Sequence, residues 1–353
     1  MGYIVLAIYF TSIIVVLLKE YFYKYRIFIY MFFAGVLTLT ASLRPVGLDP
    51  DSENYQVSFL HYDDPDIFEG IELTFLLLSR IVHLFSNDVH WLFFIYAILG
   101  VGLKLYAVRR LSILYFLPIA MYVSYYFVQH ECMQIRTGVL SGIMLLMIYY
   151  IGNKEKKKAL LLLALGTLFH YSALLLVPLF FLSNSNMTKK HLVIWASVIP
   201  ISYIIHLAGI SLYYNDISKL PFVGVKLYSY QSATINNTSD TGINVFSPMQ
   251  LFSIAIYYYL LFFHKTIESN DRFFPIMIKT MGLGLFIYVA MSFFPIVAER
   301  ITMLYKTVCI LLFADIYFTI KPWWASVVIV ACIGVILLNY CLGNVGLVFL
   351  WKV

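Results

Sequence analysis

The stretch "MQIRTGVLSGIMLLMIYYIGNKEKKKALLLLALGTLFHYSALLLVPLFFL", residues 133–182, decides the fold class of this chain. Its first apolar run, 133–151, has about the length of a bilayer-spanning helix, which needs roughly 17 to 25 residues. The basic turn "NKEKKK", 153–158, follows, and a second apolar run, 159–182, contains His170 near its middle. Two long apolar runs joined by a short basic turn are typical of neighbouring membrane helices with a cytoplasmic connection.

The composition extends this interpretation to the whole chain. Of its 353 residues 62% are hydrophobic and only 12% are charged, with a mean hydropathy of +0.86, whereas soluble domains carry about 25% charged residues. A membrane β-barrel would show alternating segments of about ten residues, but these apolar runs are long and unbroken. We therefore predict an all-α, polytopic integral membrane protein, with 1–353 as a single membrane domain of about 10–12 transmembrane helices. The predicted spans are 3–18, 27–43, 89–106, 111–128, 133–151, 192–210, 249–264, 273–293, 301–320 and 323–342.

The basic residues indicate which loops face the cytoplasm. The formal net charge is +6, and the basic side chains lie in short loops between apolar runs, a pattern that does not indicate nucleic-acid binding. Cytoplasmic loops of membrane proteins carry an excess of lysine and arginine, so we place these loops in the cytoplasm. The basic positions are Lys19, Lys24, Arg26, Lys104, Arg109, Arg110, the turn 153–158, Lys189, Lys190, Lys265, Arg272 and Lys321.

This orientation constrains two unusual apolar segments. The first, 71–86, is short and contains charged residues, so we predict a re-entrant or interfacial helix rather than a crossing. The second, 159–182, must return to the side it left, so we predict two short helices bent near His170. The alternative is one full span, which would place Lys189 and Lys190 outside. The outer, periplasmic loops are then predicted at 44–70 and 211–248.

Charged side chains away from the cytoplasmic loops are the functional candidates. A charge at the bilayer centre costs about 2.5–3.5 kcal/mol on insertion scales, and such residues commonly mark functional sites. Arg44, Arg136 and Arg300 all lie near predicted outer helix ends, and a planar guanidinium suits a phosphate-bearing lipid headgroup. The alternative is that each arginine marks an interface or pairs with a nearby acid, as Arg300 could with Glu299.

Two residues are candidate general bases. His170 lies at the predicted break of a helix pair, and its reference pKa of about 6.5 suits proton transfer; a packed core histidine is the alternative. Asp49 follows "RPVG", where Pro45 and Gly47 indicate a tight turn that holds it near Arg44. The four cysteines lie in apolar runs without metal-ligand spacing, and we predict neither a metal nor a cofactor. A divalent cation on the acids near Asp49 is the alternative.

Several segments together resemble a known family. "LRPVGLDPDSENYQ" (43–56), Glu72, the stretch 133–182 and "AERI" (298–301) resemble, in this order, the EpsG-type branch of the Wzy polysaccharide polymerases. In that family a glutamine often follows the helix-opening arginine, whereas here Thr137 follows Arg136 and Gln134 precedes it. The predicted site residues are His170 and Asp49 as catalytic residues, with Arg44, Arg136, Arg300, Glu72, Glu299 and Gln134 binding pyrophosphate or sugar.

The resemblance implies a glycosyltransferase of the bacterial inner membrane with its active site facing the periplasm. It would move a growing glycan from undecaprenyl pyrophosphate onto another lipid-linked repeat unit, producing O-antigen, capsule or exopolysaccharide. The implied partners are undecaprenyl-pyrophosphate-linked oligosaccharides, a flippase and a chain-length regulator. Alternative functions are a flippase or transporter for lipid-linked oligosaccharides, an O-antigen ligase and a membrane O-acyltransferase.

Overall fold

A computed structural model describes residues 1–49, 51–64, 72–208 and 243–344. Within these ranges the regular structure is helical and contains no strand. Most of the predicted outer loop 211–248, and the end of the loop 44–70, lie outside the described residues. The helices are α1 (Gly2–Leu17), α2 (Lys19–Phe22), η1 (Tyr23–Tyr25), α3 (Arg26–Ser42), α4 (Ser52–Leu60), α6 (Leu73–His83), α7 (Val89–Leu111), α8 (Leu117–Met121), η2 (Tyr122–Met133), α9 (Ile135–Gly152), α10 (Lys156–Phe169), η3 (Tyr171–Phe181), α11 (Lys189–Leu207), α14 (Pro248–Phe262), α15 (His264–Glu268), α16 (Phe274–Ala290), α17 (Pro295–Tyr305), η5 (Lys306–Val308), α18 (Cys309–Leu312), η6 (Ala314–Phe318) and α19 (Trp323–Asn344).

The helix lengths confirm an all-α, polytopic membrane protein. Among the described residues six helical segments are long and apolar enough to cross a membrane, and five more apolar helices have 10–17 residues. The long segments are Lys19–Ser42, Val89–Leu111, Ile135–Gly152, Lys189–Leu207, Val297–Phe318 and Trp323–Gly343.

The described residues group into two compact units. The first unit comprises Met1–Ser185, Lys265–Met277 and Thr307–Val353, and the second comprises Asn186–His264 and Ile278–Lys306. Both units consist of apolar helices, and the single membrane domain over 1–353 stays a prediction.

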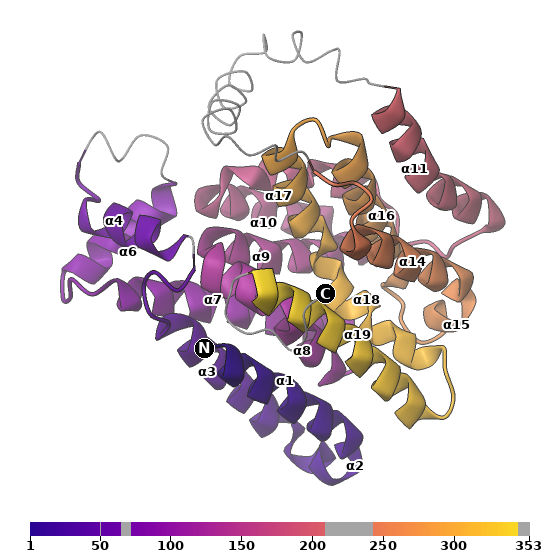
Figure 1. Ribbon diagram of the computed structural model, residues 1–353, viewed down its shortest axis with the longest axis horizontal. Helices are drawn as coiled ribbons and strands as arrows, with labels where there is room; N and C mark the ends of the chain where they lie inside the picture. The colour runs from indigo at the N-terminus through magenta and orange to yellow at the C-terminus, as the bar shows by residue number, and fades with distance from the viewer. Residues whose placement is uncertain (50, 65–71, 209–242, 345–353) are drawn as a thin grey trace. The chain divides into compact units, whose positions relative to one another are not determined.

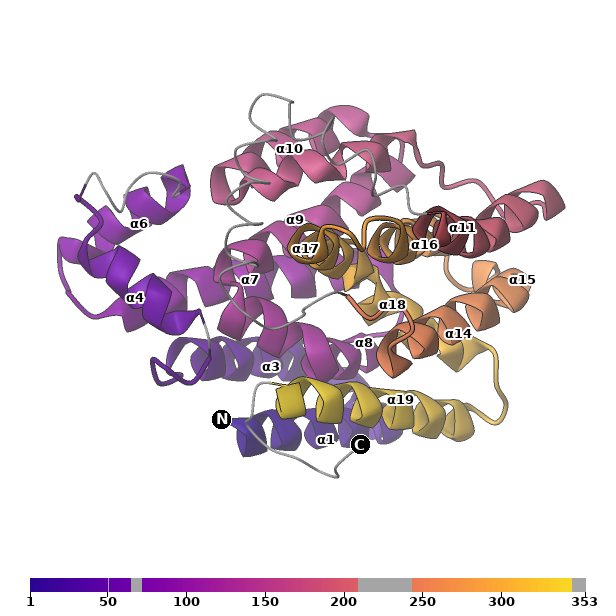
Figure 2. The same ribbon diagram turned by 45° about the horizontal axis from the view of Figure 1, so that its top comes forward.

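The core of the first unit is built around α7 and α9. Helix α7 packs against α3 and α9, α10 lies against α9, and α1 runs beside α19 (Figure 1, Figure 2). Small residues allow α9 to approach its neighbours closely. A Cβ atom on Gly142 would lie 2.7 Å from the Leu103 Cβ of α7, and one on Gly138 would lie 2.7 Å from the His130 carbonyl oxygen of η2. Gly138 and Gly142 form a G-x-x-x-G pair, a common contact in membrane helix packing.

The structure bears on both unusual segments, and the re-entrant or interfacial placement of the first stays a prediction. Helix α6 has 11 residues, about 17 Å at 1.5 Å per residue, which is too short to cross a hydrocarbon core of about 30 Å. Helix α10 ends at Phe169, and His170 has the extended backbone angles φ −159° and ψ 128° before η3 begins. The Lys156 ammonium donates to the Phe180 carbonyl oxygen at 3.0 Å, so η3 returns to the end where α10 started. The predicted break near His170 is therefore confirmed.

One stretch differs from the sequence prediction. The predicted spans 111–128 and 133–151 leave residues 129–132 as a connection, but the helix η2 continues through them to Met133 with π-type hydrogen bonding. Glu131 of η2 is paired inside the protein: the fully buried Lys104 Nζ donates to Glu131 Oε1 at 2.5 Å and to the Gly138 carbonyl oxygen at 2.6 Å. Lys104 therefore lies in the core of the first unit, and assigning it to a cytoplasmic loop is wrong.

The second unit contains α11, α14, α17 and most of α16. Two adjacent tyrosines of α14 bind the backbone of α11: the Tyr257 and Tyr258 hydroxyls donate to the carbonyl oxygens of Trp195 and Ala196, each at 2.8 Å. In the same unit Lys306 Nζ donates to the Ser253 hydroxyl at 2.9 Å. Hydrogen bonds between side chains and helix backbone of this kind replace water in an apolar surrounding.

A buried acid outside the spans predicts pH-dependent stability. Burial raises the pKa of Asp271 to about 6, although its carboxylate accepts the N–H of Phe273 at 2.7 Å. Because the folded pKa lies above the unfolded value of 3.8, the folded state is most stable below about pH 4 and loses stability as pH rises through 6. Asp271→Asn should remove this loss, measured as unfolding free energy against pH in detergent. Substituting the exposed Asp63 in the same way should leave the pH dependence unchanged, and identical curves for Asp271→Asn and wild type would contradict the prediction.

Candidate functional site

Arg136 is placed by the junction between η2 and α9. Gln134 has the non-helical angles φ −100° and ψ 65°, and it separates the two helices. Its carbonyl oxygen accepts the Gly138 N–H at 2.8 Å, which is the first helical hydrogen bond of α9, and Arg136 lies in the first turn of this helix. The packing of η2 against α9 therefore fixes the position of Arg136. The first turn of a helix also presents backbone N–H groups that favour anions.

Arg136 forms an ion pair with Glu72. The Arg136 Nη1 group donates to Glu72 Oε2. Glu72 lies immediately before α6 with an extended backbone, and its side chain is only 5% exposed, against 26% for Arg136. The Thr74 hydroxyl donates to the Leu168 carbonyl oxygen at 2.7 Å and so fixes the start of α6 to the end of α10.

His170 is the third member of this group. Its Nδ1 atom lies 3.8 Å from Glu72 Oε1 and accepts the backbone N–H of Ser172 at 3.1 Å. The broken helix therefore presents an imidazole to a carboxylate that already holds a guanidinium. Glu72, Arg136 and His170, which we call the Glu72 cluster, were all predicted as site residues, and the structure brings them together.

Four aromatic rings support the Glu72 cluster, and sequence reasoning did not single them out. Ring centroids lie 6.1 Å apart for Tyr55 and Phe75, and 6.3 Å apart both for Phe75 with Tyr96 and for Tyr96 with Phe169. The Arg136 guanidinium lies 5.5 Å from the Tyr55 ring and 5.7 Å from the Phe75 ring. Burial raises the pKa of the Tyr55 hydroxyl, with Arg136 opposing, so this residue stays neutral. Aromatic residues recur throughout the chain, so only the fold distinguishes these four.

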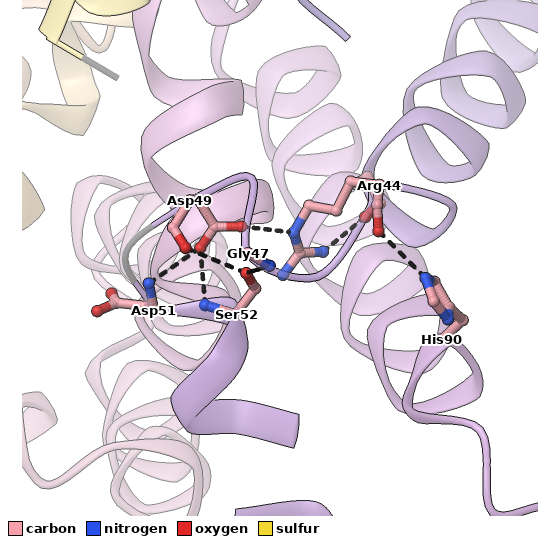
Figure 3. Close-up of polar contacts among 7 residues, drawn as sticks. Arg44, Gly47, Asp49, Asp51, Ser52 and His90 are labelled. Atoms are coloured by element: carbon pink, nitrogen blue, oxygen red, sulfur yellow. Dashed lines mark hydrogen bonds and ion pairs between the residues drawn. The ribbon is translucent and has the colours of Figure 1, made fainter. Parts of the chain in front are cut away.

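Arg44 and Asp49 form a second, buried ion pair (Figure 3). Arg44 Nε donates to Asp49 Oδ2 at 3.2 Å and Nη1 donates to the Ala41 carbonyl oxygen at 2.6 Å, while the guanidinium lies 3.9 Å from the Phe93 ring centroid. Arg44 is only 2% exposed. The guanidinium of this residue therefore contacts protein atoms on several sides.

Asp49 also caps helix α4. Its Oδ1 atom accepts the N–H groups of Asp51 at 3.1 Å and Ser52 at 2.9 Å (Figure 3). His90, at the start of α7, donates a hydrogen bond from Nε2 to the Arg44 carbonyl oxygen at 3.1 Å. Because α4 carries Tyr55, the turn fixes a helix that contacts Arg136. The predicted substrate and catalytic roles of Arg44 and Asp49 stay predictions.

The turn itself depends on Gly47. This glycine has φ +84°, and a Cβ atom there would lie 2.9 Å from Glu53 Oε1. We expect Gly47→Ala to lower the unfolding free energy by about 1 kcal/mol or more, because alanine disfavours positive φ. The matched control is Gly35→Ala in α3, where a Cβ meets nothing within 4 Å, and which should be neutral or stabilising. Equal melting temperatures for Gly47→Ala and wild type would count against this account of the turn.

The remaining predicted residues lie in the second unit. Glu299 and Arg300 are in α17 and are exposed. Their participation in one site with Arg136 stays a prediction. Within the described ranges, no three His, Cys, Asp or Glu side chains gather as metal ligands would.

Comparison with known proteins places the chain in a family. A sequence model of the EpsG family matches residues 27–345. The chain belongs to the EpsG family. The match includes every predicted site residue, from Arg44 to Arg300. Among curated proteins, the amylovoran biosynthesis protein AmsC of Erwinia amylovora is 24% identical over 313 residues, covering 86% of this chain and 81% of AmsC. No solved structure matches this EpsG-family chain.

Proposed function

We propose that this EpsG-family protein is a membrane glycosyltransferase that lengthens a bacterial polysaccharide. It transfers a growing glycan from undecaprenyl pyrophosphate to the sugar of a lipid-linked repeat unit at the periplasmic face of the inner membrane. The relative AmsC is named for the biosynthesis of amylovoran, and the family match covers most of the chain. The polymer class, whether O-antigen, capsule or exopolysaccharide, depends on the repeat unit supplied.

The observation that carries this proposal is the Glu72 cluster. Arg136 has a partly exposed side chain at a helix start, an arrangement suited to a diphosphate. Its aromatic neighbours Tyr55 and Phe75 lower the local dielectric, so charge developing on the departing pyrophosphate would be stabilised strongly. His170 stands beside the same carboxylate at a helix break.

The other predicted site residues take supporting roles in this proposal. The Arg44–Asp49 pair positions α4 and thereby Tyr55, which contacts Arg136. Gln134 shapes the junction that directs Arg136. Arg300 and Glu299, both in α17, contribute to binding of the second lipid-linked substrate.

The periplasmic orientation rests on the basic loops. The basic turn 153–158 leads into α10, and Lys189 and Lys190 follow η3 along the chain. Segment η3 returns to the end where α10 started. Both basic groups then face the cytoplasm, as the positive-inside tendency favours. His170, at the bend between the two segments, faces the opposite side.

Reconstitution tests the proposed function. Purified protein in liposomes, given a short undecaprenyl-pyrophosphate-linked repeat unit, should produce a ladder of longer lipid-linked glycans and release undecaprenyl pyrophosphate. Transport of the lipid-linked unit across the bilayer without any longer product would instead assign a flippase. Transfer of the glycan to a lipid A acceptor alone would assign a ligase.

A further inference from the structure

The ion pair between Arg136 and Glu72 engages Nη1 of the guanidinium that the proposed function assigns to a phosphate. A carboxylate and a phosphate oxygen bind a guanidinium through the same N–H groups. Glu72 is almost fully buried, whereas Arg136 keeps about a quarter of its side chain exposed. An incoming diphosphate can therefore reach Arg136 and compete with the carboxylate for its N–H groups.

The two bases predicted from sequence have their lone pairs engaged. Asp49 accepts hydrogen bonds from Arg44, Asp51 and Ser52 and is 6% exposed. Proton uptake there would break the cap of α4 and the buried ion pair at once. The carboxylate of this residue is therefore committed to the turn and to the Arg44 ion pair.

The hydrogen bonding of His170 also disfavours a base. Its Nδ1 atom accepts the Ser172 N–H at 3.1 Å, so the neutral ring carries its proton on Nε2. The nitrogen facing Glu72 is thus already engaged with the backbone that starts η3. Glu72 is the remaining proton acceptor of the Glu72 cluster.

We propose that Glu72 is the general base of the transfer and that phosphate binding releases it. This inference rests on the proposed function. The donor diphosphate takes the Arg136 N–H groups, and the freed Glu72 carboxylate accepts the proton of the acceptor hydroxyl. The hydroxyl oxygen attacks the anomeric carbon, and the bond from that carbon to the phosphate oxygen breaks with its electron pair leaving on the pyrophosphate. Glu72 then returns its proton to solvent or pyrophosphate and pairs with Arg136 again.

This exchange makes catalysis conditional on the donor. Without diphosphate, the Glu72 carboxylate is paired with Arg136, so it does not accept the proton of the acceptor hydroxyl. When diphosphate is present, the same guanidinium stabilises the leaving group while the released carboxylate accepts the hydroxyl proton. The coupling restricts activation of the acceptor to the complex that can complete the transfer.

The test separates binding from turnover with Glu72→Gln. The amide has nearly the shape of the carboxylate but cannot accept the hydroxyl proton or neutralise Arg136. We expect undecaprenyl pyrophosphate to bind Glu72→Gln in nanodiscs as tightly as wild type or up to about tenfold more tightly. Single-turnover transfer should fall by about 10²–10⁴-fold, the usual contribution of a general base. Added formate should partly restore transfer in Glu72→Ala, since formate can enter the space and accept the proton.

Two outcomes would overturn the inference, and a third would overturn the proposed function. If Glu72→Gln lost binding and turnover together, with an unchanged melting temperature, Glu72 would only hold Arg136 and the inference would be overturned. Turnover equal to wild type would overturn it as well. Failure of the wild-type protein to lengthen any glycan would instead overturn the proposed function. The matched control is Glu53→Gln on the exposed side of α4, which should retain both binding and turnover.

Discussion

Arg136→Ala should reduce glycan lengthening by at least 100-fold, because removing one preorganised donor from a charge-stabilising site costs about 10²–10³ in rate. Arg136→Lys should recover only part of this activity, since an ammonium cannot reproduce the paired N–H groups of a guanidinium. The measurement is glycan ladder formation by reconstituted protein, with undecaprenyl pyrophosphate affinity determined in parallel. Affinity should fall together with rate in Arg136→Ala, in contrast to the separation expected for Glu72→Gln.

The matched control for Arg136 is Arg80 in α6. Arg80 is exposed and lies on the helix that Glu72 precedes, so Arg80→Ala removes a nearby positive charge without touching the Glu72 cluster. It should retain ladder formation within about twofold, in keeping with the small effect of most surface substitutions. Full ladders from Arg136→Ala at wild-type expression would remove Arg136 from the site.

Lys104→Met should destabilise the protein by about 3–5 kcal/mol, because it leaves the buried Glu131 carboxylate without its cation. Both side chains are at most 1% exposed, and Lys104 is also bonded to the Gly138 carbonyl oxygen. The combined variant Lys104→Met, Glu131→Gln should recover most of the loss, since a neutral amide replaces the uncompensated charge. Thermal or denaturant unfolding in detergent would measure each value.

The control for this pair is the exposed ion pair between Lys158 and Glu155. These residues are three positions apart at the start of α10, with side chains 62% and 39% exposed. Lys158→Met should change the unfolding free energy by less than about 1 kcal/mol, as is usual for surface pairs. If Lys104→Met were equally harmless, the buried pair would not contribute to the stability of the first unit.

The local features of the sequence anticipated much of the fold. Long apolar runs require helices in a bilayer, because only a helix satisfies its own backbone hydrogen bonds there. The parity of the basic loops anticipated the short helix α6 and the break at His170, both of which the structure contains. These features depend on the composition and order of residues along the chain, and they can be predicted without knowing which helices pack against each other.

Other features could not be read in this way. Lys104 looked like a loop residue because its partner Glu131 is 27 positions away and meets it only when α7 and η2 pack together. Arg44 and Arg136 looked alike in the sequence, yet one is enclosed by Phe93 and Asp49 and the other keeps an exposed edge.

The sequence by itself determined the class of protein, the family resemblance and the residue types able to handle a diphosphate. The tertiary structure decided which of them meet: it joined Glu72 from the residue before α6, Arg136 from α9 and His170 from the break after α10. The reason is physical. Hydrophobicity acts on each segment independently, whereas an ion pair forms only where helix packing brings two charges within a few ångströms and removes the water between them.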